Sequence, residues 1–501
     1  MSDRPTTPEQ ARRRLASALL ELDPAVHDLA GRFAAAGHQL ALVGGPVRNA
    51  VLGRPTTDYD FTTDAVPDVT ERLVAPWADT GWSIGKAYGT IGARRGDLLV
   101  EITTYRSERY DPNSRKPDVA FGDDLVGDLR RRDFTVNAMA VQLPSLQFVD
   151  PFGGLDDLVA GRLRTPGTPE ESFSDDPLRM MRAARFAAQL GFTVVPEVLA
   201  AMAAMAGRIE IVAAERMRTE LEKTVLARLP VAGLRLLVDT GLADHVLPEL
   251  PALRLEIDEH HRHKDVYEHT LTVLARAIAL EDGPDGPVPR PDLVLRLAAL
   301  LHDIGKPRTR RLEPDGGVSF HHHEVVGAKM AAARLRTLRF DRETVRQVSR
   351  LVELHLRFHG YGDQEWTDSA VRRYVADAGP LLPRLHKLTR ADCTTRNRRK
   401  AERLAAAYDD LEARIRRLQE QEALDAVRPD LDGNAIMDVL GIPPGREVGE
   451  AWTYLKELRL ERGPMAPDLA REELLRWWRA RHERPGPTGA GGTSRPAHDG
   501  R

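Results

Sequence analysis

The segment LVGGPVRNAVLGRPTTDYDFTTDA, residues 42–65, determines the fold of the N-terminal part of this chain. It begins within the apolar run LALV, residues 40–43, which is typical of a short strand. Gly44 and Gly45 then allow the backbone to turn tightly and leave room for a ligand. Residues 47–52 can open a helix, whose free N–H groups suit an anionic phosphate. The pattern predicts a strand, a phosphate-binding turn and a helix.

Two carboxylates follow this turn in an extended stretch. Asp58 and Asp60 are two residues apart, so on a strand their side chains leave the same face. Two carboxylates on one face suit Mg²⁺, and two such ions can stabilise the attacking and leaving oxygens of a phosphoryl transfer. A Gly-Gly turn or an Asp-x-Asp pair alone is more often structural. Their order and spacing together favour a nucleotidyltransferase head.

Length and composition exclude several classes of protein. A chain of 501 residues predicts two to four domains. Its single cysteine, Cys393, excludes an intramolecular disulfide framework and fits a reducing cytoplasm. The N-terminal residues do not have the apolar core of a signal peptide, and no apolar run approaches the ~20 residues of a membrane span. Since the formal net charge is only −3, an RNA partner would need local basic patches.

Five further motifs extend the pattern downstream. They are VEITTYR (100–106), LRRRDFTVNAMA (129–140), VDPFGGLDDL (149–158), SDDPLRMMRAARFAAQLGF (174–192) and ERMRTELEKTV (215–225). With the opening segment, they resemble the family of CCA-adding tRNA nucleotidyltransferases and bacterial poly(A) polymerases, in the family's order. The resemblance covers roughly residues 35–460.

The resemblance and the composition together predict the domain organisation. We expect an α/β nucleotidyltransferase head with a mixed sheet, followed by an all-α neck, an HD domain and a helical tail. The expected boundaries are a helical lead-in at 1–35, the head at 36–165, the RNA-binding neck at 166–254, the HD domain at 255–400, the tail at 401–482 and a disordered end at 483–501.

The expected reaction is attack by an RNA 3′-hydroxyl on the α-phosphate of a nucleoside triphosphate, with pyrophosphate leaving. Asp58 and Asp60 would hold Mg²⁺, and Glu101 is a candidate third carboxylate; an ordinary outward strand position is the alternative for Glu101. Arginine offers forked donors to phosphate oxygens. The predicted nucleotide-binding residues of the turn and the second motif are Gly44, Gly45, Arg48, Arg131, Arg132, Asp133 and Asn137.

The motif at 174–192 predicts a helix with four polar residues at a spacing of three. Asp176, Arg179, Arg182 and Arg185 fall along one side of it. Asp176 could simply cap the helix, with Pro177 at its first position. The resemblance implies another role, in which Asp176 and Arg179 pair with the edge of C or A in place of a nucleic-acid template. Arg182 and Arg185 would contact the triphosphate or acidic partners.

Two positions depart from the family's pattern. Asn49 stands where an Asp usually follows Val-Arg, and Asp175 stands where a Glu usually precedes the base-reading Asp. Asn49 removes one negative charge near the metal site and is expected to alter how Arg48 is held.

The region 255–400 contains an ordered series of histidines and aspartates. The doublet His302-Asp303 ends an apolar helical run, and the order of the series resembles the HD phosphohydrolase superfamily. Imidazole with carboxylate suits a transition metal, which would make a bound water nucleophilic. The predicted ligands are His269, His302, Asp303, Asp392, His323 and His355.

The combined prediction is a template-independent enzyme, a monomer or homodimer, that adds C, C and A to the 3′ end of tRNA from CTP and ATP. Arg216 and Arg218 are among the candidate RNA contacts. The alternatives are a poly(A) polymerase, an enzyme that adds only CC or only A, an HD phosphohydrolase whose head merely binds nucleotides, and a non-catalytic RNA-binding module. The intact Asp58/Asp60 pair speaks against the last two.

Overall fold

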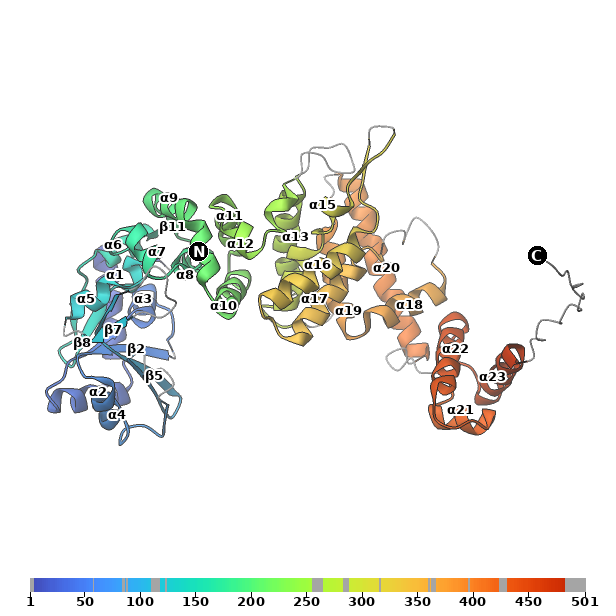
Figure 1. Cartoon of the computed structure of the whole chain (residues 1–501), viewed down its shortest axis with the longest axis horizontal. Coiled ribbons are helices and arrows are strands. Elements are labelled where there is room, and N and C mark those ends of the chain that lie inside the picture. Colours follow the sequence, from blue (N-terminus) through green and yellow to red (C-terminus); the bar gives the residue numbers. More distant parts are fainter. Residues whose placement is uncertain are drawn as a thin grey trace, which may run out of the picture. The chain divides into compact units, whose positions relative to one another are not determined.

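The computed structural model describes thirteen stretches of the chain, and the predicted disordered end at 483–501 lies outside them. The stretches are 4–56, 58–82, 86, 89–109, 118–121, 124–254, 265–282, 288–314, 317–358, 361, 366–394, 397–422 and 430–482. The chain divides into two compact units. Unit 1 comprises Met1–Glu281 and Pro289–Glu353, and unit 2 comprises Asp282–Val288 and Leu354–Arg501. Figure 1 shows the order of the elements along the chain.

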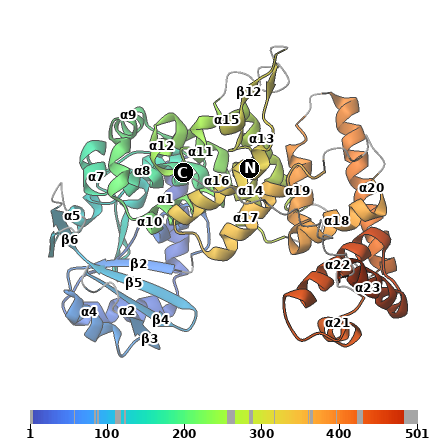
Figure 2. The ribbon, with the colours of Figure 1, turned by 45° about the vertical axis from the view of Figure 1, so that its right-hand side comes forward.

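The head contains a seven-stranded sheet in the order β3-β4-β5-β2-β1-β8-β9, of which Figure 2 labels β2 to β5. Its central strands β2 and β5 are parallel, and every other neighbouring pair is antiparallel, so the predicted mixed sheet is confirmed. The strands are β1 (Leu40–Val43), β2 (Asp58–Thr63), β3 (Thr80–Trp82), β4 (Thr90–Arg95), β5 (Leu98–Thr104), β8 (Ala140–Leu143) and β9 (Gln147–Val149). A separate hairpin pairs β6 (Arg106–Arg109) with β7 (Asp118–Phe121).

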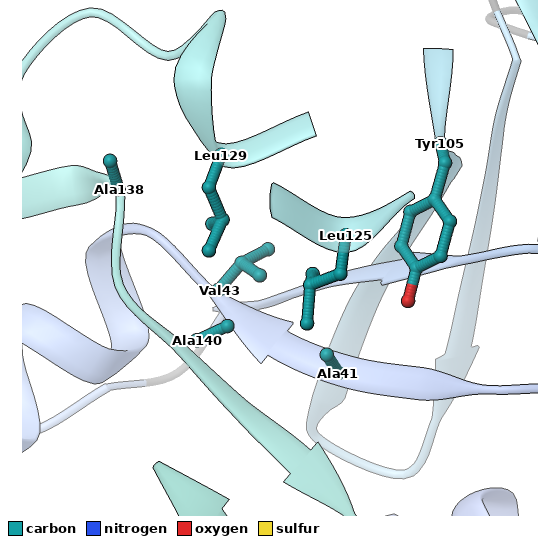
Figure 3. Packing of buried hydrophobic residues seen from close by; sticks show 7 residues of the cluster. All are labelled: Ala41, Val43, Tyr105, Leu125, Leu129, Ala138 and Ala140. Carbon is teal, nitrogen blue, oxygen red and sulfur yellow. The ribbon is translucent and has the colours of Figure 1, made fainter. Parts of the chain in front are cut away.

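Among the described residues of the head, six α-helices and the 3₁₀ turn at Thr135–Asn137 lie around this sheet. In the predicted lead-in, Thr7 and Asp23 cap the first two helices through their side chains. The elements are α1 (Pro8–Leu20), α2 (Pro24–Ala35), α3 (Gly45–Leu52), α4 (Pro67–Val74), α5 (Leu125–Arg130), η2 (Thr135–Asn137) and α6 (Gly154–Ala160). Helix α5 is fastened by a buried apolar cluster over β1 and β8, drawn in Figure 3: Ala41, Val43, Tyr105, Leu125, Leu129, Ala138 and Ala140. This packing fixes the segment that follows α5, which carries three predicted site residues.

The neck is built around one almost entirely buried helix. Helix α8 packs against α10 and α11, and Gly233 of α11 permits the close approach, because a Cβ there would lie 2.6 Å from the Ala184 carbonyl oxygen. The neck elements are α7 (Pro169–Asp175), α8 (Leu178–Leu190), α9 (Pro196–Met205), η3 (Ala206–Ile211), α10 (Ala214–Val225), α11 (Pro230–Asp239), α12 (Leu242–Val246) and η4 (Pro251–Leu253), with the paired strands β10 (Arg162–Leu163) and β11 (Thr193–Val194).

The remaining elements of unit 1 belong to the histidine-rich region. They are α13 (Val266–Leu280), α14 (Leu293–Leu301), α15 (Lys306–Thr309), the hairpin β12 (Arg311–Leu312) and β13 (Val318–Ser319), α16 (His323–Thr337) and α17 (Arg342–Leu354), whose last residue falls in unit 2. Gly305, after the His-Asp doublet, packs directly on α16, since a Cβ there would lie 2.1 Å from the His323 carbonyl oxygen. Only glycine fits at this position.

Unit 2 is helical throughout its described part. It contains α18 (Asp368–Ala378), η5 (Gly379–Leu381), α19 (Leu382–Asp392), α20 (Arg398–Glu422), α21 (Gly433–Leu440), α22 (Arg446–Arg462) and α23 (Pro467–His482). The last three helices share a core of Leu431, Ile436, Ala451, Leu455, Ala470 and Leu474. None of the helices in the described stretches combines the length and apolar character that a membrane crossing needs.

Candidate active site

A cavity of about 570 Å³ in unit 1 gathers most of the predicted site residues. It is lined from the head by Asp60 of β2 and Glu101 of β5, and from the neck by α8. All eleven predicted nucleotide-binding residues line it: Gly44, Gly45, Arg48, Arg131, Arg132, Asp133, Asn137, Asp176, Arg179, Arg182 and Arg185. Six guanidinium groups and four carboxylates therefore meet around one space, which suits a ligand that carries several negative charges.

The glycine turn forms one end of the cavity. Gly44 precedes α3 with φ of 72° and ψ of −127°, a conformation that side chains rarely adopt. A Cβ at Gly44 would also lie 3.0 Å from Arg132 Nη1 and 3.9 Å from Asp60 Oδ2. The turn thus brings the first N–H groups of an eight-residue helix between an arginine and a carboxylate.

The carboxylates are placed by the register of the two parallel strands. Asp60 on β2 pairs with Glu101 on β5, and Asp58 lies two residues earlier on β2, at its more exposed start. Burial raises the pKa of Asp60, and the charges of Glu101 and Asp58 raise it further, against the opposing effect of Arg132. A cation would relieve this repulsion. Oxygen-only ligands suit a hard divalent ion, so these residues fit a metal of that kind.

Arg48 lies deep in the cavity and is held by two amides. Its Nη1 donates to Asn137 Oδ1 (2.6 Å), and its Nη2 donates to Asn49 Oδ1 (3.0 Å). Burial lowers the pKa of Arg48 to about 10, which leaves it charged at neutral pH. Asn49, the departure from the family pattern, therefore contacts Arg48 directly. Because both partners are neutral, the charge of Arg48 stays available to an anionic ligand.

Asp133 links the head to the neck. Its Oδ2 accepts from Arg182 Nε (2.7 Å) and Nη2, and its Oδ1 accepts from Asn137 Nδ2 (2.9 Å) and from the backbone N–H of Phe134 (2.8 Å). Burial opposes ionisation of Asp133, but the charges of Arg182 and Arg179 and the hydrogen bonds from Arg182 and Asn137 together outweigh it and hold the pKa of Asp133 well below its ordinary value. A continuous series of side chains thus runs from Arg48 through Asn137 and Asp133 to α8.

Asp176 stands at the junction of α7 and α8. Its Oδ1 accepts from the backbone N–H of Leu178 (3.1 Å), so it satisfies a donor of the first turn, although α8 begins at Leu178 and Pro177 precedes the helix. Its Oδ2 pairs with Arg216 Nη2 of α10 (2.8 Å). Arg216, predicted from sequence as an RNA contact, therefore holds a cavity residue.

The three arginines of α8 each have a partner. Arg179 donates to Ser172 Oγ (2.9 Å) and to the carbonyl oxygen of Arg131. Arg185 Nε pairs with Glu220 Oε2 of α10 (2.6 Å), and Arg182 pairs with Asp133. These contacts place the guanidinium groups, so they meet a ligand in defined positions.

Sequence reasoning missed Phe61, Thr90, Thr103 and Phe186, which line the cavity, and two acids that hold its arginines. Glu220 holds Arg185, Asp128 holds Arg131 and Arg132, and Phe186 lies beneath Arg185, whose guanidinium carbon is 4.1 Å from its ring centroid. Glu220 and Phe186 lie within two of the motifs quoted above, but no sequence pattern near either residue shows that it contacts Arg185. Asp128 precedes the second motif and carries no separate signal.

A second cluster of polar side chains surrounds Asp303 in the histidine-rich part of unit 1. His302 Nε2 and His323 Nε2 lie 3.2 and 3.3 Å from its two carboxylate oxygens, and His269 Nε2 lies 3.5 Å from Oδ2. Lys306 Nζ lies 3.0 Å from the same oxygen. The cluster is buried at the end of α14.

The two buried imidazoles of this cluster are oriented by backbone carbonyls. His302 Nδ1 is 2.9 Å from the Ala299 oxygen, and His323 Nδ1 is 2.8 Å from the Phe320 oxygen. A proton on each Nδ1 leaves Nε2 unprotonated, which is the arrangement that metal-binding histidines adopt. The donor set fits a divalent transition metal. His355 and Asp392 belong to unit 2, and their role as ligands stays a prediction.

Comparison with known families divides the chain into three matching regions. Residues 40–164 match the Poly A polymerase head domain, residues 191–253 match the probable RNA and SrmB-binding site of polymerase A, and residues 266–397 match the HD domain. The head and HD matches both imply divalent metals.

Individual relatives match over different lengths. The chain is 35% identical over 445 residues to the A-adding tRNA nucleotidyltransferase of Deinococcus radiodurans. The matched region covers 87% of this chain and 95% of that protein. It is 43% identical over 208 residues to the CCA-adding enzyme of Levilactobacillus brevis, covering 41% of this chain but only 51% of that protein. Its fold is similar to that of the Bacillus stearothermophilus CCA-adding enzyme in complex with CTP (TM-score 0.65, 22% identity), over 92% of this chain and all of the other.

Proposed function

This chain belongs to the CCA-adding tRNA nucleotidyltransferase and poly(A) polymerase family, and we propose that it adds C, C and A to the 3′ end of tRNA from CTP and ATP. The family resemblance read from the motifs is confirmed, and the chain is a nucleotidyltransferase with an attached HD domain. We further propose a cytoplasmic enzyme, because its substrate tRNA is used there, that acts as a monomer or homodimer.

One observation carries the proposal for the head. The cavity joins a glycine turn, a carboxylate pair in register and a helix bearing Asp176 and Arg179. The triphosphate would lie along the turn, with Arg48 and Arg132 beside it. The base would lie towards α8, where a carboxylate and a guanidinium present acceptor and donor groups to base edges. These positions support recognition of a nucleotide by protein alone, without a template.

The residues position the reactants for transfer. Asp58 and Asp60 would hold Mg²⁺, with Glu101 beside them, and the bound ions would stabilise the charge that develops on the attacking 3′-oxygen and the departing pyrophosphate. Arg48 would balance triphosphate charge from a buried position, where electrostatic effects are stronger than in water. Asp133 and Asn137 would fix the position of Arg48 relative to α8, so that the base and the triphosphate of one nucleotide are positioned at the same time.

For the HD domain, we propose a divalent transition metal bound by His269, His302, Asp303 and Asp392, with His323 and His355 completing a second position. The oriented imidazoles of His302 and His323 support this set. When bound, such a metal would lower the pKa of a coordinated water and allow phosphoester hydrolysis. A phosphohydrolase activity on RNA ends is therefore the second proposed function.

Nucleotide incorporation tests the first function. Purified enzyme with Mg²⁺ receives a tRNA that lacks its last three nucleotides and a tRNA that ends in CC, with CTP alone, ATP alone or both. We expect two C additions with CTP and a terminal A when ATP is also present. Addition of A only, and only to the tRNA ending in CC, would instead make it an A-adding enzyme, as the relative from Deinococcus radiodurans is named. A long A tail on any RNA would make it a poly(A) polymerase.

Replacement of Asp303 by Asn tests the HD site. We expect tightly bound transition metal to fall from one or two ions per chain to near zero, because the carboxylate that both His302 and His323 face loses its charge. Metal analysis after dialysis measures this. CCA addition should stay within about twofold, since Asp303 lies outside the cavity. The exposed neighbour His321, replaced by Ala, is the control and should retain the metal. Full metal content in Asp303→Asn would contradict the assignment.

A further inference from the structure

A buried acid behind the cavity lining, which was not predicted from the sequence, contacts two of the arginines that line the cavity. Asp128, on α5, has a relative exposure of 1%. Its Oδ1 accepts from Arg131 Nη2 (2.6 Å) and Nε (3.0 Å), and its Oδ2 lies 3.4 Å from Arg132 Nη2. Thr62 Oγ1 of β2 lies 3.2 Å from the same Oδ2 and 3.0 Å from the Thr103 carbonyl oxygen, so its one hydrogen is shared between these two acceptors. One carboxylate thus holds two consecutive guanidinium groups that line the cavity.

The position of Asp128 is itself fixed. Leu125 and Leu129, on the same helix, belong to the buried cluster over β1 and β8 (Figure 3). Burial opposes ionisation of Asp128, but Arg132 and Arg131 outweigh it and keep its pKa below the ordinary value, so it is charged at neutral pH. A charged carboxylate on a rigid helix is a firm anchor for a long, flexible arginine.

The restraint matters because of what Arg132 faces on its other side. Arg132 Nη1 and Asp60 Oδ2 both lie within 4 Å of the same point, the position that a Cβ would take on Gly44. Of the neighbouring arginines, Arg132 lowers the pKa of Asp60 the most. A guanidinium and a carboxylate that border the same point can form a forked ion pair if the arginine is free to turn. Such a pair would occupy the oxygens that a metal needs.

We propose that Asp128 is a positioning residue that fixes Arg131 and Arg132 at the cavity wall and keeps Arg132 from pairing with the metal-binding carboxylate Asp60. The inference rests on the proposed function, because it takes Asp60 as a ligand of Mg²⁺. In this arrangement Arg132 contacts the triphosphate, and both oxygens of Asp60 remain available to the metal.

The Mg²⁺ dependence of incorporation tests the inference. In Asp128→Asn, the side chain loses its charge and Arg132 is released. We expect the Mg²⁺ concentration for half-maximal incorporation to rise about tenfold, because the guanidinium now competes for Asp60. Since competition can be overcome, kcat at saturating Mg²⁺ should recover to within about threefold of wild type, whereas a general loss of structure would lower it at every Mg²⁺ concentration.

Two comparisons distinguish the loss of the restraint on Arg132 from a general loss of structure. Asp124→Asn makes the same substitution on the same helix, where Asp124 caps α5 through the N–H groups of Val126 (3.0 Å) and Gly127 (2.9 Å). Asn keeps one of these two acceptor oxygens and is among the preferred cap residues, and Asp124 holds no residue of the cavity, so the Mg²⁺ dependence should not change. In the double variant Asp128→Asn with Arg132→Gln, no guanidinium competes, and the half-maximal Mg²⁺ concentration should match that of Arg132→Gln alone. An unchanged value in Asp128→Asn, or a rise that persists in the double variant, would overturn the inference.

A milder variant covers the case in which Asp128→Asn does not fold. Thr62→Val keeps the shape of a buried residue but removes the donor to Asp128 Oδ2. We expect a smaller rise in the Mg²⁺ requirement, about twofold, which also disappears with Arg132→Gln; no rise would count against the inference. Failure of the proposed function is recognised separately. If Asp60→Asn retains Mg²⁺-dependent incorporation, the metal assignment is wrong and the inference falls with it.

Discussion

Replacing Asp60 by Asn is expected to reduce nucleotide incorporation by about 1,000-fold or more, while the fold is retained. Asp60 lines the cavity, pairs in register with Glu101 and lies on the same strand as Asp58. An amide keeps the shape but removes the charge that a divalent ion needs, and electrostatic stabilisation of transferring phosphoryl groups is among the largest contributions to catalysis. Incorporation into a tRNA that lacks CCA, at saturating CTP and ATP, measures the effect.

The same substitution should not destabilise the protein when metal is removed. Because burial, Glu101 and Asp58 raise the pKa of Asp60, its charged form disfavours folding at neutral pH. Neutral Asn removes that repulsion, so the melting temperature of Asp60→Asn in EDTA should equal or exceed that of wild type. Asp97→Asn, in the exposed turn between β4 and β5, is the control and should leave both activity and melting unchanged. An active Asp60→Asn enzyme would refute the metal site.

Removal of Asp133 should affect both stability and nucleotide binding. Asp133→Ala removes the nearer charged partner of Arg182, leaving the longer contact with Glu220 (3.9 Å), and releases Asn137, which in turn holds Arg48. Breaking a fully buried ion pair costs about 3–5 kcal/mol. The cost here should be smaller, about 2–3 kcal/mol, since the Arg182 side chain remains 35% exposed and can be hydrated. The KM for CTP and ATP should rise about 10- to 100-fold. Urea unfolding and steady-state kinetics measure the two effects.

The stability difference between wild type and Asp133→Ala should depend on pH in one direction. The folded-state pKa of Asp133 lies below its unfolded value of about 3.9, so its contribution is present above that value and is lost as the pH falls through the folded pKa. The difference should therefore be equal at pH 7 and pH 5 and smaller at pH 3.5.

An exposed pair provides the control for this variant. Asp239 pairs with Arg254 (2.5 Å), and both side chains are about half exposed. Asp239→Ala should cost less than about 1 kcal/mol, as is usual for surface ion pairs. If Asp133→Ala cost no more than Asp239→Ala, the link between head and neck would be unimportant for stability.

The local parts of this protein could be predicted from its sequence. The run at 40–43, the two glycines and the following helix appear where the pattern places them, because apolar periodicity and the conformational freedom of glycine act over a few residues. The alternation along β2 likewise put Asp58 and Asp60 on one face. The family motifs indicated which residues take part in the reaction. For Glu101 the sequence left two alternatives open, and the strand register places it beside Asp60.

The partners of the site residues were decided only by the tertiary structure. Arg48 meets Asn137, 89 residues away, and Arg182 meets Asp133, 49 residues away. Asp128 and Glu220 carry no motif that names the arginines they hold, and Arg216, expected to bind RNA, pairs with Asp176. The physical reason is one of range. Backbone sterics and side-chain periodicity are set by neighbours in sequence, whereas a buried charge takes its partner from whatever segment the packed core brings beside it.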